Sequence, residues 1–398
     1  MSFATTQKIG VLTATIVGMN AMIGAGIFAI PSTLANKVGP AAIISFLIVV
    51  AATWLMAQSI ARVAQLYPQE GSFYAYAYPW AGHVGGLIAN ACYLIGLLIA
   101  MGLITHGVGQ HLVHYFPTFP AETLGVSTLI FLTLLNAFGV SLSSLGQQIL
   151  IALTVFPLIA TTFICLTKAN INNFFPFAPF GALSIFDATR VIAFAFFGFE
   201  ASASLFTVIE NPEKNVPKAL TYSLLAVAFL YFIFIVSLIL AVPLELFKQF
   251  PGPISVPLSY IFPDNKWIIE GIHLASISAI LGTLHSMIWA SSTLFLSFLN
   301  KLRCTPQKAE SSVLCPLLNK QTCTLAIGSA IYLSFKFIHS EMFFSFTNIF
   351  LLITFVLSMT TLLFIKSEWK SGRNYLTVAG LIAVFGIFCC ALMDIFYS

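Results

Sequence analysis

Charged residues are scarce in this chain, and they never gather into a long polar block. Asp, Glu, Lys and Arg make up 8% of the 398 residues and hydrophobic residues 59%, whereas soluble domains carry roughly 25% charged residues. A chain without a polar block of domain size has no segment that would fold alone in water. We therefore expect one polytopic membrane domain over residues 1–398, in contact with a lipid bilayer.

Signatures of several other protein classes are also missing. The sequence contains no GxxxxGK[ST] phosphate loop and no HExxH pair, and its seven cysteines form no CxxC pair. No basic cluster alternates with aromatic residues, as a nucleic-acid-binding surface would. We expect no enzyme activity, no use of ATP, no metal or other cofactor, and no nucleic-acid partner. A membrane-embedded enzyme would need convergent catalytic residues at one depth, and the polar residues here are scattered.

Apolar runs of about 20 residues, enough to cross about 30 Å of hydrocarbon, recur along the whole chain. The first run is far longer than the core of a signal peptide, which predicts a retained spanning helix. Eleven of the 17 Lys and Arg residues then fall on the side of the N-terminus, which predicts that this side is cytoplasmic. The predicted spans are residues 9–36, 40–66, 83–115, 122–140, 145–167, 186–209, 218–242, 267–299, 321–339, 342–365 and 374–396.

Helix-breaking residues interrupt two of these spans. In the first span, "IGAGIF" at residues 23–28 is followed by Pro31. In the sixth, "FAFFGFEASAS" at residues 194–204 places Gly198 two residues before Glu200. A broken helix in hydrocarbon exposes backbone polar groups at a cost of several kcal/mol each unless they face protein or a water-filled cavity. A bound substrate would satisfy them.

The position of the two breaks is typical of a transporter. Breaks five spans apart predict an inverted repeat, here residues 9–167 and 186–365, with an additional span at 374–396. Glycine also lets spanning helices pack closely, which is the alternative explanation for either break alone.

The chemistry of the two breaks matches an amino acid. A half-helix N-terminus carries a positive dipole end that suits a carboxylate, and carbonyls freed near Phe194 and Phe197 would accept hydrogen bonds from an ammonium group. The amides expected at the carboxylate are those of Ile23, Gly24, Ala25, Gly26 and Ile27.

These stretches resemble the amino acid/polyamine/organocation (APC) superfamily of transporters. Beside "IGAGIF", the resemblance rests on "YPQEGSFYAYAYPWAGHVGG" at residues 67–86 and "FFGFEASASLFTVIENPEKNVPKAL" at residues 196–220. "FEASAS" and Pro157 are most similar to the basic amino acid/polyamine antiporters, which include arginine/agmatine exchangers. The resemblance implies an all-α LeuT-like bundle of two five-span repeats in the inner membrane, working by alternating access. It leaves a homodimer open.

The resemblance also implies residue roles. Ile23, Ala25 and Gly26 would hold the carboxylate, and the carbonyls of Ile23, Phe194 and Phe197 would accept from the amine. Phe194 would also cover the substrate.

Four further residues are candidates for the predicted site. The resemblance makes Tyr93 a gating tyrosine of the third span and Glu200 an acid linked to gating and proton response. Glu200 lies inside an apolar span, where carboxylates are rare and usually functional. In the eighth span, His285 and Trp289 are candidates to border the substrate.

Two departures from the arginine exchangers bear on the substrate. Ala25 stands where they carry a hydroxyl beside the carboxylate, and Met101 stands where an asparagine meets the guanidinium. A lost hydrogen bond to a charged group costs about 1.5–3 kcal/mol, and methionine suits an apolar or flexible side chain. The sequence therefore disfavours a guanidinium substrate.

The sequence leaves the mode of transport open. Thr154 stands near the position where some proton-coupled relatives carry a lysine in the fifth span, which favours exchange. Proton-coupled uptake of neutral amino acids and a sensor that binds amino acids without transporting them are the alternatives.

Overall fold

The computed structural model describes residues 8–24, 26–69, 72–138, 140–250, 254–303, 319–337, 343–370, 372 and 374–397. This part of the chain is almost entirely helical, with one isolated β-bridge between Ile9 and Ile209. Each of the eleven predicted spans contains a described helix.

Helices of three kinds occupy those spans. Among the described helices, seven are long and apolar enough to cross a membrane by themselves. They are α3 (Ala42–Leu66), α4 (Ser72–Val113), α6 (Val140–Thr167), α9 (Pro212–Ala241), α12 (Lys266–Arg303), α14 (Phe343–Thr360) and α16 (Asn374–Tyr397). The shorter α5 (Ala121–Ala137) and α13 (Lys320–Phe337) fill two further spans. The broken spans are α1 (Val11–Met22) with α2 (Gly26–Lys37), and α7 (Leu183–Phe196) with α8 (Ala201–Ser204).

Short helices connect the spans. They are η1 (Gly39–Ala41), η2 (Ile171–Phe174), η3 (Phe206–Val208), α10 (Leu244–Gln249), α11 (Ser255–Ile261), η5 (Thr361–Phe364) and α15 (Lys366–Lys370).

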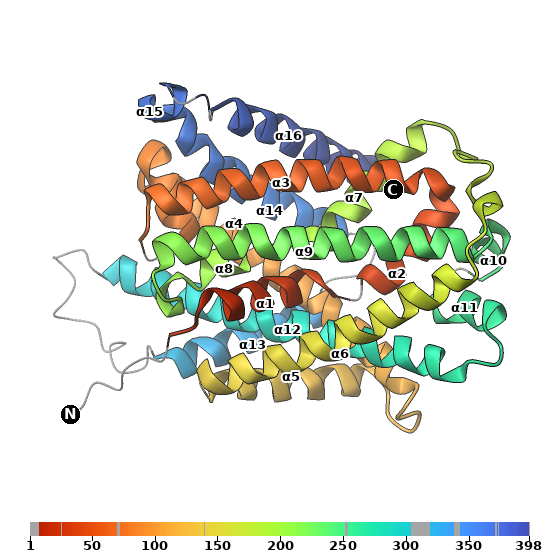
Figure 1. Ribbon diagram of the computed structural model, residues 1–398. Helices are drawn as coiled ribbons and strands as arrows, with labels where there is room; N and C mark the ends of the chain where they lie inside the picture. The colour runs from red at the N-terminus through yellow and green to blue at the C-terminus, as the bar shows by residue number, and fades with distance from the viewer. Residues whose placement is uncertain are drawn as a thin grey trace.

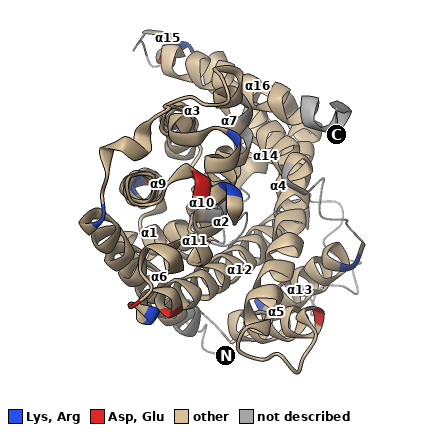
Figure 2. Ribbon diagram, turned by 90° about the vertical axis from the view of Figure 1, so that its right-hand side faces the viewer, with Lys and Arg blue, Asp and Glu red and all other residues tan. Residues whose placement is uncertain are grey.

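The long helices run alongside one another and form a bundle (Figure 1). In α12, 61% of the most apolar stretch is buried, against 28% in α6 and α16. The core therefore gathers around α12, and the two exposed helices present apolar side chains outward, as lipid requires. A view along the bundle shows few charged positions among the helices (Figure 2).

Helix α4 is longer than the predicted third span. It begins at Ser72, so most of the stretch expected to connect the second and third spans is helical. The helix kinks at Gly82, where φ is 65° and ψ is −163°. Only glycine adopts this conformation readily, since it lacks a Cβ atom. The direction of the chain therefore changes at Gly82 without a loop.

The second half of the sixth span is shorter than predicted. After the four residues of α8 and the turn of η3, the chain pairs with the segment that precedes α1. The Ile9 amide donates to the Val208 carbonyl at 2.8 Å, and the Glu210 amide donates to the Ile9 carbonyl at 2.9 Å. This pairing gives hydrogen-bond partners to backbone N–H and C=O groups that would be bonded within the helix if the helix continued. It also holds the starts of α1 and α9 together.

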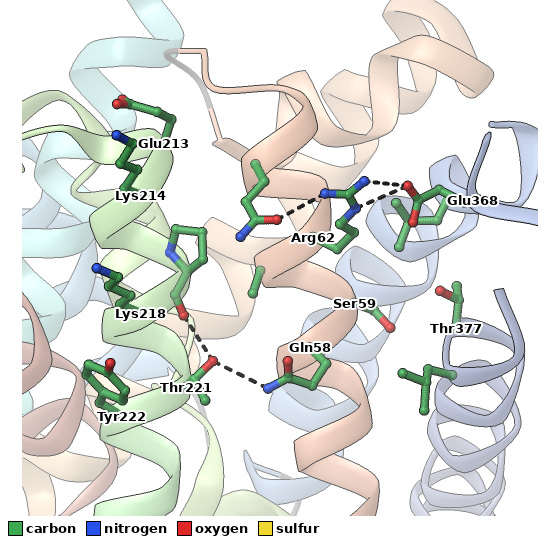
Figure 3. Close-up of a pocket in the computed structure, with 15 residues that line it drawn as sticks. Gln58, Ser59, Arg62, Glu213, Lys214, Lys218, Thr221, Tyr222, Glu368 and Thr377 are labelled. Carbon is green, nitrogen blue, oxygen red and sulfur yellow. Dashed lines mark hydrogen bonds and ion pairs between the residues drawn. The ribbon is translucent and has the colours of Figure 1, made fainter. Parts of the chain in front are cut away.

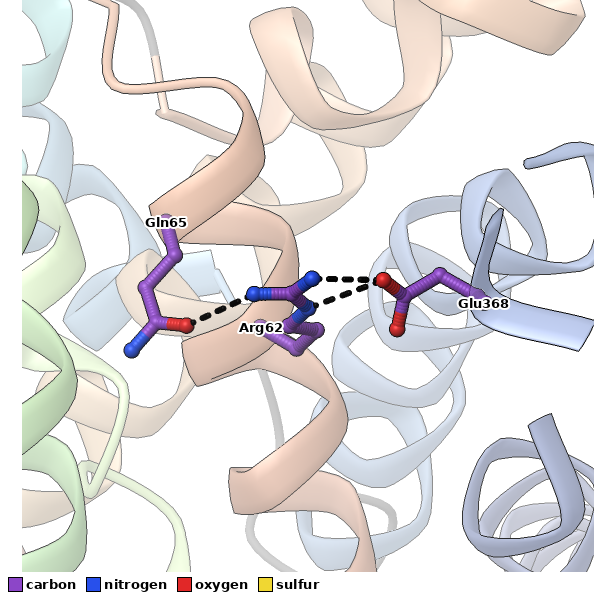
Figure 4. Close-up of polar contacts among 3 residues, drawn as sticks. All are labelled: Arg62, Gln65 and Glu368. Carbon is purple, nitrogen blue, oxygen red and sulfur yellow. Dashed lines mark hydrogen bonds and ion pairs between the residues drawn. The ribbon is translucent and has the colours of Figure 1, made fainter. Parts of the chain in front are cut away.

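One ion pair ties α3 to α15. The Arg62 guanidinium donates to Glu368 Oε1 through Nη2 at 2.6 Å and through Nε at 3.1 Å (Figure 4). Its Nη1 donates to Gln65 Oε1 at 3.1 Å. The Glu368 side chain is 2% exposed, so its carboxylate depends on these hydrogen bonds.

Candidate functional site

The first break separates α1 from α2 by three residues. Ile23 closes α1 with φ of −78° and ψ of 77°, which is not helical. Its amide donates to the Met19 carbonyl at 2.7 Å, and the Gly24 amide donates to the Met22 carbonyl at 2.8 Å. The helix therefore ends in a tight turn, as the glycines predict.

Side chains from other helices donate to two carbonyls at the end of α1. The Tyr231 hydroxyl of α9 donates to the Met22 carbonyl at 2.9 Å, and Thr283 Oγ1 of α12 donates to the Asn20 carbonyl at 2.8 Å. Tyr231 and Thr283 are buried. Because each unsatisfied carbonyl in hydrocarbon costs several kcal/mol, these two donors stabilise the break.

The start of α2 leaves backbone amides directed into the break. The first four N–H groups of any α-helix lack partners within the helix, and in α2 they begin at Gly26 and Ile27. Ile23 and Ile27 are both 1% exposed. The expected carboxylate contact at Ala25 lies outside the described residues. A buried helix N-terminus of this kind binds anions.

The second break follows α7. Phe197 is extended, with φ of −65° and ψ of 141°, and Gly198 has φ of 111°. The Gly198 amide donates to Glu200 Oε2 at 3.0 Å, so the acid holds the backbone of its own break. Glu200 is fully buried, and its Oε1 accepts no hydrogen bond within the described structure.

The two breaks touch each other. A methyl group at Gly198 would lie 2.6 Å from the carbonyl carbon and oxygen of Ala21 in α1, and 2.9 Å from Met287 Cε in α12. Ser202 of α8 also donates to the Ala14 carbonyl of α1 at 3.1 Å. Residues separated by more than 170 positions along the chain therefore form one site.

Tyr93 of α4 joins this site. The Ser204 hydroxyl donates to the Tyr93 hydroxyl at 3.3 Å. The Tyr93 hydroxyl also interacts with the Glu200 carboxyl group. The Phe73 ring packs against the Tyr93 ring at 4.3 Å between centroids. The structure thus brings together the tyrosine and the acid that the sequence analysis selected separately.

The other selected residues have different surroundings. Phe194 lies in the last turn of α7 and is half-buried, and its carbonyl accepts from the Phe197 amide at 3.3 Å. The Phe197 ring packs on Phe355 of α14 at 6.1 Å. Met101 is fully buried in α4.

The face of α12 that meets the breaks carries Thr283 and Met287, not the predicted Trp289. A methyl group at Gly24 would lie 2.9 Å from Thr283 Oγ1, and Met287 lies four residues further on the same helix face. Trp289 is two residues from Met287 and so points elsewhere, with Lys320 Nζ 5.9 Å from its ring centroid. Its neighbour His285 instead meets Asn136 of α5, at 2.7 Å between Nδ1 and Nδ2.

A buried polar cluster beside the first break was not selected from the sequence. Asn20 Nδ2 donates to Gln147 Oε1 of α6 at 2.6 Å, and the Ser286 hydroxyl of α12 donates to the same oxygen at 2.7 Å. All three side chains are at most 1% exposed. Polar residues inside apolar spans are the signal that would have found them.

Comparisons with known proteins agree on one family. A model of the family described as amino acid permease matches residues 9–396. The branched-chain amino acid permease BcaP of Bacillus subtilis is 27% identical over 69% of this chain and 63% of its own length. The methylthioribose transporter of the same species is 26% identical over 67% of this chain and 61% of its own length.

A plant relative and a solved structure extend the comparison. The cationic amino acid transporter 9 of Arabidopsis thaliana is 25% identical over 73% of this chain and 54% of its length. The chain thus spans between half and two thirds of the length of these relatives. A Na⁺-coupled sialic acid symporter has the same fold, with a TM-score of 0.61 and 14% identity over 97% of this chain and 90% of that one.

Substitution of Gly198 tests the contact between the breaks. We expect Gly198→Ala to lower the Tm of the detergent-purified protein, because alanine at φ of 111° is strained by about 1–3 kcal/mol and its methyl group clashes with the Ala21 carbonyl. Gly386→Ala in α16 is the control, since a methyl group there meets no atom within 4 Å. Equal Tm values for the two variants would contradict the described contact.

Proposed function

The chain belongs to the amino acid permease family, and we propose that it exchanges amino acids across the inner membrane by alternating access. The observation that carries this proposal is the contact between two broken helices at Gly198 and Ala21. Two breaks that share one buried site present donors and acceptors at a depth where lipid supplies none. A solute that matches both sets is then held inside the bundle.

An α-amino acid has the matching chemistry. We propose that its carboxylate accepts hydrogen bonds from the amides of Gly26 and Ile27 at the start of α2, together with the contact predicted at Ala25. Its ammonium group donates to carbonyls of Ile23, Phe194 and Phe197 at the ends of α1 and α7. The positive dipole end of α2 and the negative end of α7 favour this orientation over the reverse.

The proposed substrate has an uncharged, apolar side chain. Met287 lies against the second break, and the family resemblance places Met101 beside the substrate. Thioethers adapt to apolar groups of different shapes and offer a guanidinium no strong acceptor. The Bacillus subtilis relative named for branched-chain amino acids supports the same substrate class.

Exchange is the mode that the surroundings of the first break favour. Asn20, Gln147, Thr283 and Ser286 form a neutral network there. Thr154 Oγ1 donates to the Leu150 carbonyl of its own helix at 2.9 Å. A neutral network has no group that takes up and releases a proton, so it supplies no coupling by itself.

Proton-coupled uptake is the second candidate, and Glu200 is the observation that favours it. Its carboxyl group is fully buried between a break and Tyr93, and intramembrane carboxylates commonly relay protons.

A thermal-shift screen tests the substrate class. We expect apolar neutral amino acids such as leucine to raise the Tm of the detergent-purified protein by a few degrees, because a ligand that binds only the native state stabilises it by mass action. Arginine, agmatine, cadaverine and putrescine should leave Tm unchanged. Stabilisation by arginine or the amines alone would overturn the proposed specificity. If none of the twenty amino acids changes Tm, the proposed amino-acid site is wrong.

Glu200→Gln tests whether Glu200 exchanges a proton during transport. If the acid only holds the Gly198 amide, glutamine keeps an acceptor oxygen and the pH profile of uptake into proteoliposomes stays unchanged. If Glu200 gates or drives transport by exchanging a proton, the profile flattens because glutamine does not titrate. We expect the flattened profile for Glu200→Gln, with exchange retained. Glu210→Gln, which changes an exposed acid ten residues on, should keep the profile of the unmodified protein.

A further inference from the structure

A cavity of about 720 Å³ lies away from the two breaks, between α3, α9 and α16. Its walls carry Gln58 and Arg62 of α3, Lys214, Lys218 and Thr221 of α9, and Thr377 of α16 (Figure 3). The cavity is at the end of the bundle where α9 begins and α3 ends. In the orientation predicted by the positive-inside rule, that end faces the cytoplasm.

Two neighbouring lysines line this cavity. Lys214 and Lys218 lie one turn apart on α9 and are both exposed, and within the described residues neither forms an ion pair. Like charges four residues apart on a helix repel each other. An anion held between them would remove this repulsion and gain two charge-assisted hydrogen bonds.

The other charged groups of the cavity leave it a positive balance. Glu368 is paired with Arg62, so these two charges offset each other. Glu213 also lines the cavity and offsets part of the charge of the lysines. The lining therefore holds three cations and two carboxylates, a balance that suits a single negative charge.

The cavity is polar on one side and apolar on the other. Gln58 Nε2 donates to Thr221 Oγ1 at 3.3 Å across the gap between α3 and α9. Further along the same walls, Tyr222 and Leu376 are 52% and 43% exposed. In a membrane protein such exposed apolar side chains contact lipid. A ligand that matches both the polar and the apolar side of the cavity has an anionic head and a hydrocarbon tail.

The surroundings place the polar side of the cavity at the membrane interface. Trp369 and Tyr375, on either side of the link from α15 to α16, are 52% and 74% exposed. Exposed Trp and Tyr residues gather at the level of lipid headgroups. Basic pockets between spanning helices at this level on the cytoplasmic side bind anionic headgroups.

We propose that the cavity between α3, α9 and α16 binds one anionic phospholipid, with its phosphate held by Lys214 and Lys218. The acyl chains lie outward along Tyr222 and Leu376. The site goes beyond the proposed transport of amino acids and is independent of it. A bound lipid would bridge α9, which donates to the first break through Tyr231, and the peripheral α16.

Native mass spectrometry of the full chain tests this proposal. Delipidated protein is titrated with phosphatidylglycerol and, separately, with phosphatidylcholine. We expect one phosphatidylglycerol to bind more tightly than phosphatidylcholine, and Lys214→Ala/Lys218→Ala to weaken its binding about thirtyfold, since each basic residue near the surface contributes roughly fivefold. Lys214→Arg/Lys218→Arg, which keeps both charges, should retain binding and shows that loss in the alanine variant is not misfolding.

A matched pair of substitutions and a free anion complete the test. Lys8→Ala/Lys366→Ala removes two exposed charges from the same end of the bundle, outside the cavity, and should bind phosphatidylglycerol like the unmodified protein. Equal loss in both alanine variants would show a diffuse charge effect and overturn the proposal. So would equal binding of the two lipids, or displacement of phosphatidylglycerol by millimolar inorganic phosphate, which would indicate a site for a free anion.

Discussion

The backbone polar groups freed at two helix breaks impose the constraint on which the rest of this structure depends. Inside a bilayer they have no water, so each needs a partner from the protein or from a ligand. At the end of α1, Tyr231 of α9 and Thr283 of α12 supply hydroxyl donors. At the end of α7, Glu200 accepts from the Gly198 amide. The breaks are therefore held by side chains from helices on several sides of the site.

This arrangement links the site to the rest of the bundle. Because the donors to α1 come from α9 and α12, any displacement of α1 must break these hydrogen bonds or carry those helices with it. Gly198 packs on the Ala21 carbonyl. If one break moves, the other must therefore move with it, or this contact is lost. A substrate that replaces part of these partners would thus shift the balance between arrangements of the bundle, as alternating access requires.

The sequence predicts those features that depend on neighbouring residues. The glycines of "IGAGIF" and Gly198 locate both breaks, because glycine and proline act on the local backbone. Apolar runs of spanning length locate the helices. The kinked extension of α4 before Gly82 was missed, since the aromatic and small residues of that stretch suit a helix as well as a connection.

Features that depend on contacts between distant helices could not be predicted from the sequence. Trp289 was selected with His285 as a residue of the eighth span that could border the substrate, whereas Thr283 and Met287 occupy the face that meets the breaks. The rotation of α12 about its axis decides between them, and that rotation is set by packing across the bundle. Asn20 and Gln147 are each visible as polar residues in apolar spans, but their pairing over 127 positions is not. Tyr93 was selected through the family resemblance, and Glu200 through the resemblance and its place inside an apolar span. Their proximity in the bundle is not visible in the sequence.

The most direct measurement of the central claim is the affinity of the purified protein for leucine and for analogues altered at one end. In the proposed site the carboxylate lies at the start of α2 and the ammonium group at the carbonyls of α1 and α7. Leucine methyl ester, 3-methylbutylamine and 4-methylpentanoate each lose one of these contacts, and at about 1.5–3 kcal/mol per lost charged hydrogen bond each should bind about 10- to 100-fold more weakly than leucine. An analogue without the carboxylate or without the amine that binds as tightly as leucine would contradict the account.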